Sequence, residues 1–289
     1  MRPMRIAITG TTGRVGKALV HHLAGRHEVV ALPRTCLDLA LPGCENILRE
    51  LDFDVLLNPA GLTSLEQCED EPLLARRVNA EAPEALAAVC RERRLKMLHF
   101  STDYVFDGRE PGLRTEDELP SPLSIYGKTK RDGEQAVLTA GAAVMRISWV
   151  FGPEKPAFPD QILERALAGQ ELAAVADKFS RPTFTGDLCE WVGAWLDAGT
   201  PAGCFHACNG GPVTSWHGMA LEILACLADR GIATPPLKAL ALDEMTAFRA
   251  PRPRHTAMET RRLEALLGKA PRDWREAMRD HLESRLISR

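Results

Sequence analysis

The string GTTGRVG restricts the fold of this chain more than any other feature. It follows the short β-rich run RIAIT and opens a segment whose apolar side chains recur at helical spacing. Gly10 permits a tight turn, Gly13 lets the backbone approach a phosphate, and Gly16 lets the helix pack closely on the strand. The helix N-terminus then offers free N–H groups to an anion. The string predicts a phosphate-binding strand–turn–helix unit; a turn with chance glycines is the alternative.

Short apolar strands alternate with helical segments through the first half of the chain. The strand-like runs are HEVVAL, VLLNPAG, KMLHFSTDYVF and AAVMRISWVFG, and the clearest helical segments are RVGKALVHHLAG and EAPEALAAVCRERR. Such alternation is typical of βαβ units, which build a parallel sheet covered on both faces. We therefore expect an α/β fold with a Rossmann-type, doubly wound parallel sheet.

The pattern loosens after Gly152, where a smaller C-terminal substrate-binding lobe is expected. Helical segments such as FPDQILERALAGQ and SWHGMALEILACLADRG continue, and a basic, proline-rich loop, APRPRHTAMET, precedes a closing helix. We expect the chain to cross between the two parts more than once. The predicted nucleotide-binding domain comprises residues 1–150 and a returning segment near 181–206, and the lobe comprises 151–180 and 207–289.

Composition excludes several classes of protein. The formal net charge of −3 gives no attraction to nucleic acid or to an anionic membrane. No apolar run reaches the roughly 18 residues of a membrane span. The first residues, MRPMRIAITG, enter a strand directly, so no secretory signal is expected. We expect a cytoplasmic protein.

The eight cysteines are scattered, mostly within apolar segments. This distribution is typical of buried, reduced thiols rather than of a disulfide framework. Cys204, His206 and Cys208 would share one face of a strand, but no second cluster completes a set of metal ligands. No metal site is predicted.

The residues after the second strand bear on the choice of cofactor. A dinucleotide site usually has an acidic residue about 20 positions after its glycines, where it binds the ribose. Pro33 occupies the expected position here, and Arg34 follows. An arginine can bind a 2′-phosphate, and the missing carboxylate removes a repulsion against it. The sequence favours NADPH and leaves NADH open. Arg34 as a solvated loop residue is the alternative, and Asp38 is a candidate for the adenosine end.

Tyr126 and Lys130, in SIYGKTK, are spaced to lie on one face of a helix. A lysine ammonium beside a phenol is expected to lower the phenol's pKa from its usual value of about 10. A tyrosine tuned in this way can give a proton to a developing alkoxide near neutral pH. The pair predicts a ketone-reducing centre, with a surface helix as the alternative.

A second string, FSTDYVF, supplies partners for this pair. A strand is expected to end here, and parallel α/β sheets bind ligands at the carboxyl ends of their strands. Thr102 is placed to hydrogen-bond a substrate oxygen beside Tyr126, with Asp103 and Tyr104 near the same crevice. A turn capped by Thr102 and Asp103 is the structural alternative.

These motifs together resemble the extended short-chain dehydrogenase/reductases. Within that superfamily the chain resembles the dTDP-4-dehydrorhamnose reductase family over nearly its whole length. The resemblance rests on LNPAGLTSLEQCEDEP, VNAEAP, FSTDYVF, SPLSIYGKTKRDGE, MRISWVFG, DKFSRPT, RPRHTAMET and PRDWREAM. It implies reduction of the C4 ketone of dTDP-6-deoxy-L-lyxo-4-hexulose by NADPH, giving dTDP-L-rhamnose, a precursor of cell-surface polysaccharide. Tyr126 would donate the proton, Thr102 would orient the carbonyl, and Lys130 would support Tyr126 and the cofactor ribose.

The resemblance also implies which residues bind the two ligands. The expected cofactor-binding residues are Gly10, Thr12, Gly13, Arg14, Val15, Gly16, Arg34, Asp38, Leu39, Ala60, Gly61, Thr63, Tyr126 and Lys130. The expected substrate-binding residues are Leu65, Thr102, Asp103, Tyr104, Trp149 and Arg181. Arg181 is the candidate for the substrate diphosphate, because a guanidinium binds phosphate oxygens in pairs.

Some residues depart from the family pattern around the expected substrate crevice. Leu62 stands where the family usually has His, and Gln67 stands where it usually has Lys. The segment WVFGPEKPAFP lacks the family's GNNF loop. Three alternatives therefore stay open: another nucleotide-sugar reductase, an epimerase, or a non-catalytic NADP-binding subunit like the β subunit of methionine adenosyltransferase. A homodimer is also left open.

Overall fold

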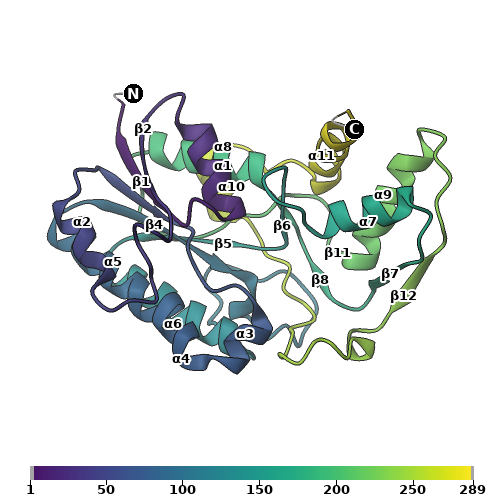
Figure 1. Cartoon of the computed structure of the whole chain (residues 1–289), viewed down its shortest axis with the longest axis horizontal. Coiled ribbons are helices and arrows are strands. Elements are labelled where there is room, and N and C mark those ends of the chain that lie inside the picture. Colours follow the sequence, from purple (N-terminus) through teal and green to yellow (C-terminus); the bar gives the residue numbers. More distant parts are fainter. Residues whose placement is uncertain (1–2, 288–289) are drawn as a thin grey trace.

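Six parallel strands form the main sheet of the computed structural model, which describes residues 3–287 (Figure 1). Their order across the sheet is β10-β5-β4-β3-β1-β2. The strands are β1 (Arg5–Thr9), β2 (Glu28–Leu32), β3 (Val55–Asn58), β4 (Lys96–Thr102), β5 (Ala143–Ile147) and β10 (Gly203–His206). The chain starts at β1, places β2 on one side of it at the edge of the sheet, and then adds β3, β4, β5 and β10 on the other side, so the order reverses beside β1. This reversal is where doubly wound sheets bind their ligands.

Helices cover both faces of this sheet. One face carries α1 (Arg14–Leu23), α8 (Thr185–Asp197) and α10 (Arg261–Leu267), and the other carries α2 (Ile47–Glu50), α5 (Ala82–Glu92) and α6 (Ile125–Thr139). Side chains from both faces of the central strands are buried; Ile6 and Ile8 lie in one apolar cluster and Ala7 lies in the other. The predicted Rossmann-type fold is confirmed.

The chain leaves the sheet after β5 and later returns to it. The strand β10 pairs with β5 at the edge of the sheet, and α8 packs against α1. Elements from residues 185–206 thus belong to the same layers as the N-terminal half. The division of the chain into two domains stays a prediction.

A third apolar cluster holds the C-terminal part together. Its helices are α7 (Phe158–Leu167), α9 (Trp216–Ala228) and α11 (Trp274–Ile287). In Figure 1, α7 and α9 lie near β7 (Leu172–Val175) and β12 (Leu237–Leu240), and α11 contacts α9. Two short strand pairs join this part to the sheet region: β6 (Val150–Phe151) with β9 (Thr183–Phe184), and β8 (Phe179–Ser180) with β11 (Thr214–Ser215). Within residues 3–287, every helix is too short or too polar to cross a bilayer.

The remaining elements are short helices. Of these, α3 (Leu65–Asp70), α4 (Pro72–Arg76) and the π-helix η2 (Arg77–Glu81) lie between β3 and β4, and the others are three 3₁₀ turns, η1 (Cys44–Asn46), η3 (Asp103–Val105) and η4 (Leu242–Glu244). The helices α3 and η2 both contact α6, which carries Tyr126 and Lys130.

Candidate active site

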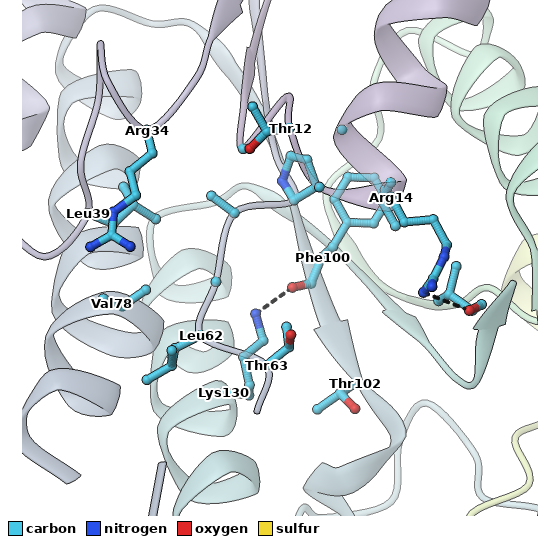
Figure 2. A pocket seen from close by; sticks show the side chains of 18 of the residues that line it. Thr12, Arg14, Arg34, Leu39, Leu62, Thr63, Val78, Phe100, Thr102 and Lys130 are labelled. Atoms are coloured by element: carbon cyan, nitrogen blue, oxygen red, sulfur yellow. Dashed lines mark hydrogen bonds between the residues drawn. The ribbon is translucent and has the colours of Figure 1, made fainter. Parts of the chain in front are cut away.

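A cavity of about 640 Å³ lies at the carboxyl ends of the central strands. Every residue of the predicted cofactor-binding set lines it, and so does Thr102. In Figure 2, Arg34 and Leu39 lie on one side of the cavity and Arg14 lies on the other, with Lys130 between them. Residues from five different loops and helices, expected separately from the sequence, therefore meet around one space.

The glycine turn allows the backbone to pass unusually close to itself. Gly10 has φ +55°, a conformation that side chains other than glycine rarely adopt. A Cβ atom on Gly16 would lie 2.3 Å from the Gly10 carbonyl oxygen, closer than any tolerated contact. The helix α1 begins after Gly13, which has no side chain to cap the first N–H groups. These groups face the cavity and suit a diphosphate.

Ser124 caps the start of α6 and so fixes the position of Tyr126 in the first turn of that helix. The Ser124 hydroxyl accepts a hydrogen bond from the Gly127 amide at 3.1 Å, and the Glu69 carboxylate accepts one from the Ile125 amide at 2.8 Å. Both bonds satisfy amides that an α-helix leaves without partners in its first turn. Tyr126 therefore sits in that first turn, and Lys130 sits one turn later on the same side of the cavity.

Lys130 is held by main-chain and imidazole acceptors rather than by the phenol. Its ammonium donates to the Phe100 carbonyl at 2.6 Å, as Figure 2 shows, and lies 3.1 Å from Nε2 of His99. His99 in turn lies 3.0 Å from the side chain of Asn58, and all these groups are buried. Burial lowers the pKa of Lys130 to about 8, partly opposed by the charge of Glu134.

The expected lowering of the Tyr126 pKa is wrong for this structure. Burial raises the pKa of Tyr126, and only a hydrogen bond from Thr102 acts strongly in the other direction. The reason is that the phenolate would lose its hydration, while the Lys130 ammonium is directed at the Phe100 carbonyl and His99. A raised pKa keeps Tyr126 protonated at neutral pH, which is the form that a proton donor needs.

The lowered pKa of Lys130 predicts a pH dependence. Lys130 carries its charge below about pH 8 and loses it above, although a free lysine keeps its charge to about pH 10. We expect kcat/KM for NADPH to fall as pH rises through about 8, since this constant reports ionisations of the free enzyme. A pH profile of initial rates measures it. Lys130→Arg, which stays charged, should lack this limb even if it is slower; the same limb in both proteins would contradict the assignment.

The predicted substrate residues other than Thr102 lie in different parts of the structure. Leu65 and Tyr104 pack with Tyr126 in one cluster, where the two tyrosine rings lie edge to face with centroids 5.7 Å apart. Trp149 lines a second cavity, described below. The structure thus places Tyr104 against the candidate proton donor and Leu65 in the same cluster, although neither residue lines the first or the second cavity.

Asp103 and Arg181 line neither cavity. The buried Asp103 carboxylate accepts hydrogen bonds from Ser148, Ser180 and Thr256, so it joins three distant segments. Arg181 donates to the Met258 carbonyl at 3.3 Å. The family resemblance implied substrate contacts for both, whereas the hydrogen bonds in the structure connect both side chains to the segment 256–258.

A second cavity, of about 530 Å³, adjoins the first on the C-terminal side. Its walls are largely aromatic and aliphatic: Trp149, Val150, Pro156, Ala157, Phe158, Pro159, Ala173, Ala174, Val175, Trp216, Met219, Leu240, Met245 and Phe248, together with Gln161 and Arg14. Trp149 has φ +44°, rare for a bulky residue, and its buried indole N–H has no acceptor among residues 3–287. Strain and an unused donor at a cavity wall are typical of a ligand site.

Asn79 was not predicted as a site residue, yet it positions the loop beside Lys130. It lies fully buried in the π-helix, where its amide accepts from Leu62 N at 2.8 Å and donates to Leu62 O at 2.9 Å. It also donates to Thr129 on α6 at 3.3 Å. The sequence signal was VNAEAP, which marked the family but not this role. Irregular π turns often occur at functional positions.

Replacing Asn79 with alanine should disturb the cavity without removing any lining side chain. The Leu62 amide would lose its partner and the Leu62 carbonyl would keep only the weak Cys68 Sγ donor at 3.6 Å, and an unmet buried group costs about 1–3 kcal/mol. We expect lower stability and kcat/KM for NADPH reduced about tenfold. Thermal unfolding and initial rates measure the two effects, and Asn79→Asp, which keeps one acceptor, should lie between. Wild-type rates in the alanine variant would exclude this role.

Other lining residues follow from the fold rather than from motifs. The cavity is also lined by Leu37, Pro59, Leu62, Gln67, Leu74, Val78, Phe100, Ser101, Ile147, Val150 and Lys155. Leu62 and Gln67 were noted in the sequence only as departures from a family pattern. Among residues 3–287, no three His, Cys, Asp or Glu side chains gather as metal ligands would.

Known proteins resemble this chain along its whole length. Residues 4–286 match the family model described as RmlD substrate binding domain. A probable dTDP-4,6-dihydroxy-2-methyloxan-3-one 4-ketoreductase from Streptomyces antibioticus is 39% identical, over 96% of this chain and 94% of that protein. The dTDP-4-dehydrorhamnose reductase of Mycolicibacterium smegmatis is 36% identical, over 96% and 84%.

The fold agrees with these sequence matches. The crystal structure of dTDP-4-dehydrorhamnose reductase from Bacillus anthracis in complex with NADP has a TM-score of 0.88 and 25% identity, covering 98% of this chain and all of that one. The match over residues 4–286 shows that the chain belongs to the RmlD substrate-binding-domain family, and its sequence and fold are similar to those of dTDP-4-dehydrorhamnose reductases.

Proposed function

We propose that this protein reduces the C4 ketone of a dTDP-4-keto-6-deoxy sugar with NADPH and forms dTDP-L-rhamnose. It is an oxidoreductase of the dTDP-4-dehydrorhamnose reductase type that uses NADPH. The observation that carries the proposal is the first cavity, whose wall joins a glycine turn to Thr102, Tyr126 and Lys130. We place this activity in the cytoplasm, and a homodimer stays open.

The residues of the cavity fit the cofactor. Gly10 and Gly16 allow the turn to pack against Ala60 and against itself more closely than any Cβ atom would permit, and the start of α1 offers free amides for the diphosphate. When bound, NADPH supplies the hydride for C4. Lys130 uses two of its three N–H groups on Phe100 and His99, so one remains for the ribose or for the Tyr126 oxygen.

Tyr126 and Thr102 are proposed to interact with the carbonyl oxygen of the substrate. The Thr102 hydroxyl donates to Asp103 Oδ1 and accepts from the Tyr104 amide in the structure, and it would turn its O–H to the carbonyl oxygen when the substrate binds. The Tyr126 hydroxyl gives its proton to the alkoxide that forms as hydride reaches C4. The ketone becomes an alcohol, and the phenolate recovers its proton from solvent. Because Tyr126 is buried and protonated, the proton is present before hydride arrives.

Arg34 is proposed to recognise the 2′-phosphate of NADPH. Its exposed side chain lines the cavity and is paired with Asp38 at 3.1 Å. Arg34→Ala should lower kcat/KM for NADPH about 10- to 100-fold and leave NADH nearly unchanged, since charge-assisted bonds to phosphate contribute about 1.5–3 kcal/mol. Initial rates with both cofactors measure the ratio, and Arg34→Lys should retain part of the preference. Equal losses with NADPH and NADH would assign Arg34 another role.

The second cavity is proposed to hold the nucleoside of the substrate. Aromatic side chains such as Trp149 and Trp216, whose ring centroids lie 5.6 Å apart, provide flat apolar surfaces for a base. The indole N–H of Trp149 is buried and has no partner among residues 3–287, so it would reach a polar atom of the ligand only after the indole ring shifts. The proposed sugar and nucleoside sites therefore adjoin each other.

A reductase of a different dTDP-linked ketone is the second candidate. It is favoured by the relative from Streptomyces antibioticus, whose name specifies another sugar, and by Leu62 and Gln67 in the first cavity.

The test combines the protein with NADPH, dTDP-glucose and the upstream dehydratase and epimerase. NMR of the product should identify dTDP-L-rhamnose. If NADPH is oxidised only when the upstream epimerase is omitted, the second candidate is supported. If the protein releases an isomerised ketone without net consumption of NADPH, it is itself an epimerase.

A further inference from the structure

Arg14 stands where the two cavities meet. The cavities share two lining residues, Arg14 and Val150, and among the described residues that line the second cavity Arg14 alone is charged. Figure 2 shows its side chain extending away from Arg34, on the far side of the glycine turn. A cation is thus present at the passage from a cavity with polar catalytic groups to a cavity with apolar walls.

Neutral acceptors hold the Arg14 guanidinium in place. Its Nη2 donates to Pro156 O at 2.8 Å, Nη1 donates to Val150 O at 3.0 Å, and Nε lies 3.4 Å from Lys155 O. A guanidinium has five N–H groups, so two remain unused. Among residues 3–287, no carboxylate forms an ion pair with it, although Glu154 and Asp160 act from a greater distance.

The charge of Arg14 is therefore fixed, partly desolvated and not neutralised by direct contact. Burial lowers the pKa of Arg14 from its usual value, but an arginine stays protonated at any physiological pH. A fixed cation with free donors is a ready site for phosphate oxygens, because little ordering is needed when the anion binds.

A nucleotide sugar that spans both cavities must carry its diphosphate past this point. With the ketone beside Thr102 and Tyr126 and the base among the aromatic side chains, the diphosphate lies between them. We propose that Arg14 binds the diphosphate of the nucleotide-sugar substrate. This inference rests on the proposed function. It replaces two sequence expectations: a cofactor-phosphate role for Arg14 and a diphosphate role for Arg181, which lines neither cavity.

Binding measurements on Arg14 variants test the assignment. Equilibrium binding of dTDP, thymidine and NADP⁺ is compared for the wild type, Arg14→Lys and Arg14→Gln. Arg14→Gln should bind dTDP about 10- to 100-fold more weakly and thymidine and NADP⁺ within about threefold of wild type, because only dTDP places a diphosphate at the junction. Arg14→Lys keeps the charge but loses the paired donors, so its dTDP affinity should lie between.

Each other outcome has a definite meaning. Equal weakening of dTDP and thymidine would show that Arg14 only supports the segment 150–156, and weakening of NADP⁺ alone would make it a cofactor ligand; either result overturns the proposal. Unchanged dTDP binding in Arg14→Gln overturns it while leaving the proposed function intact. Wild-type protein that does not bind dTDP would contradict the proposed function itself, and this proposal with it.

Discussion

Replacing Tyr126 with phenylalanine should reduce kcat by about 10²- to 10⁴-fold, the usual contribution of a positioned proton donor. The ring would still fill its place beside Tyr104 and Leu65, so the fold and the cavity should be kept. The alkoxide would lose the one buried phenol that stands beside Thr102 in this cavity. Single-turnover rates with saturating NADPH measure the loss, and NADPH affinity should stay within about threefold of wild type.

The companion variant Thr102→Val separates proton donation from orientation of the carbonyl. It removes one hydrogen bond to the substrate oxygen and should cost about tenfold, since a neutral hydrogen bond contributes about 1 kcal/mol. Thr102→Ser keeps the hydroxyl and should retain most of the rate. Near wild-type turnover in Tyr126→Phe would remove Tyr126 from the chemistry and leave the cavity without its proposed donor.

Replacing Gly16 with alanine should weaken NADPH binding about 10- to 100-fold and lower stability. The new methyl group would lie 2.3 Å from the Gly10 carbonyl oxygen, so the turn and the start of α1 must move apart. Overpacking of this kind costs about 1–3 kcal/mol, and the phosphate-binding amides would move with the turn. Titration with NADPH and thermal unfolding measure the two effects.

Gly25 provides the matched control for this substitution. It follows the same helix, and a Cβ atom there would meet nothing within 4 Å. Gly25→Ala should therefore bind NADPH like the wild type. If Gly16→Ala and Gly25→Ala bind NADPH equally well, the close contact between Gly16 and Gly10 does not shape the cofactor site.

Features set by short stretches of sequence could be predicted. The glycine turn, the alternation of strands and helices, and the spacing of Tyr126 and Lys130 are all local, and parallel strands bring their carboxyl ends together at one edge. That is why the predicted cofactor-binding residues, which lie far apart between Gly10 and Lys130, line one cavity. The position of Arg34 at the wall of the first cavity could be predicted because β2 ends at Leu32, just before it.

Features set by contacts between distant segments could not be predicted. The pKa of Tyr126 depends on how completely it is buried, and Lys130 is directed by His99 and the Phe100 carbonyl on another strand. Asp103 was expected to face the substrate, but it meets Thr256, 153 positions away. Spacing along the chain carries no record of such partners, so the motif could not predict the direction of the Tyr126 pKa shift or the partners of Lys130 and Asp103.

Hydride transfer to C4 is the central claim, and isotope transfer tests it most directly. The protein is given NADPH that carries deuterium at the transferred position, together with the dTDP-4-keto-6-deoxy sugar, and the product is examined by NMR and mass spectrometry. We predict one deuterium at C4 of the sugar for each NADPH oxidised, and almost no oxidation of NADPH, hence almost no labelled product, by Tyr126→Phe in the same time. An unlabelled product, or NADPH that persists in the presence of the ketone, would contradict the account.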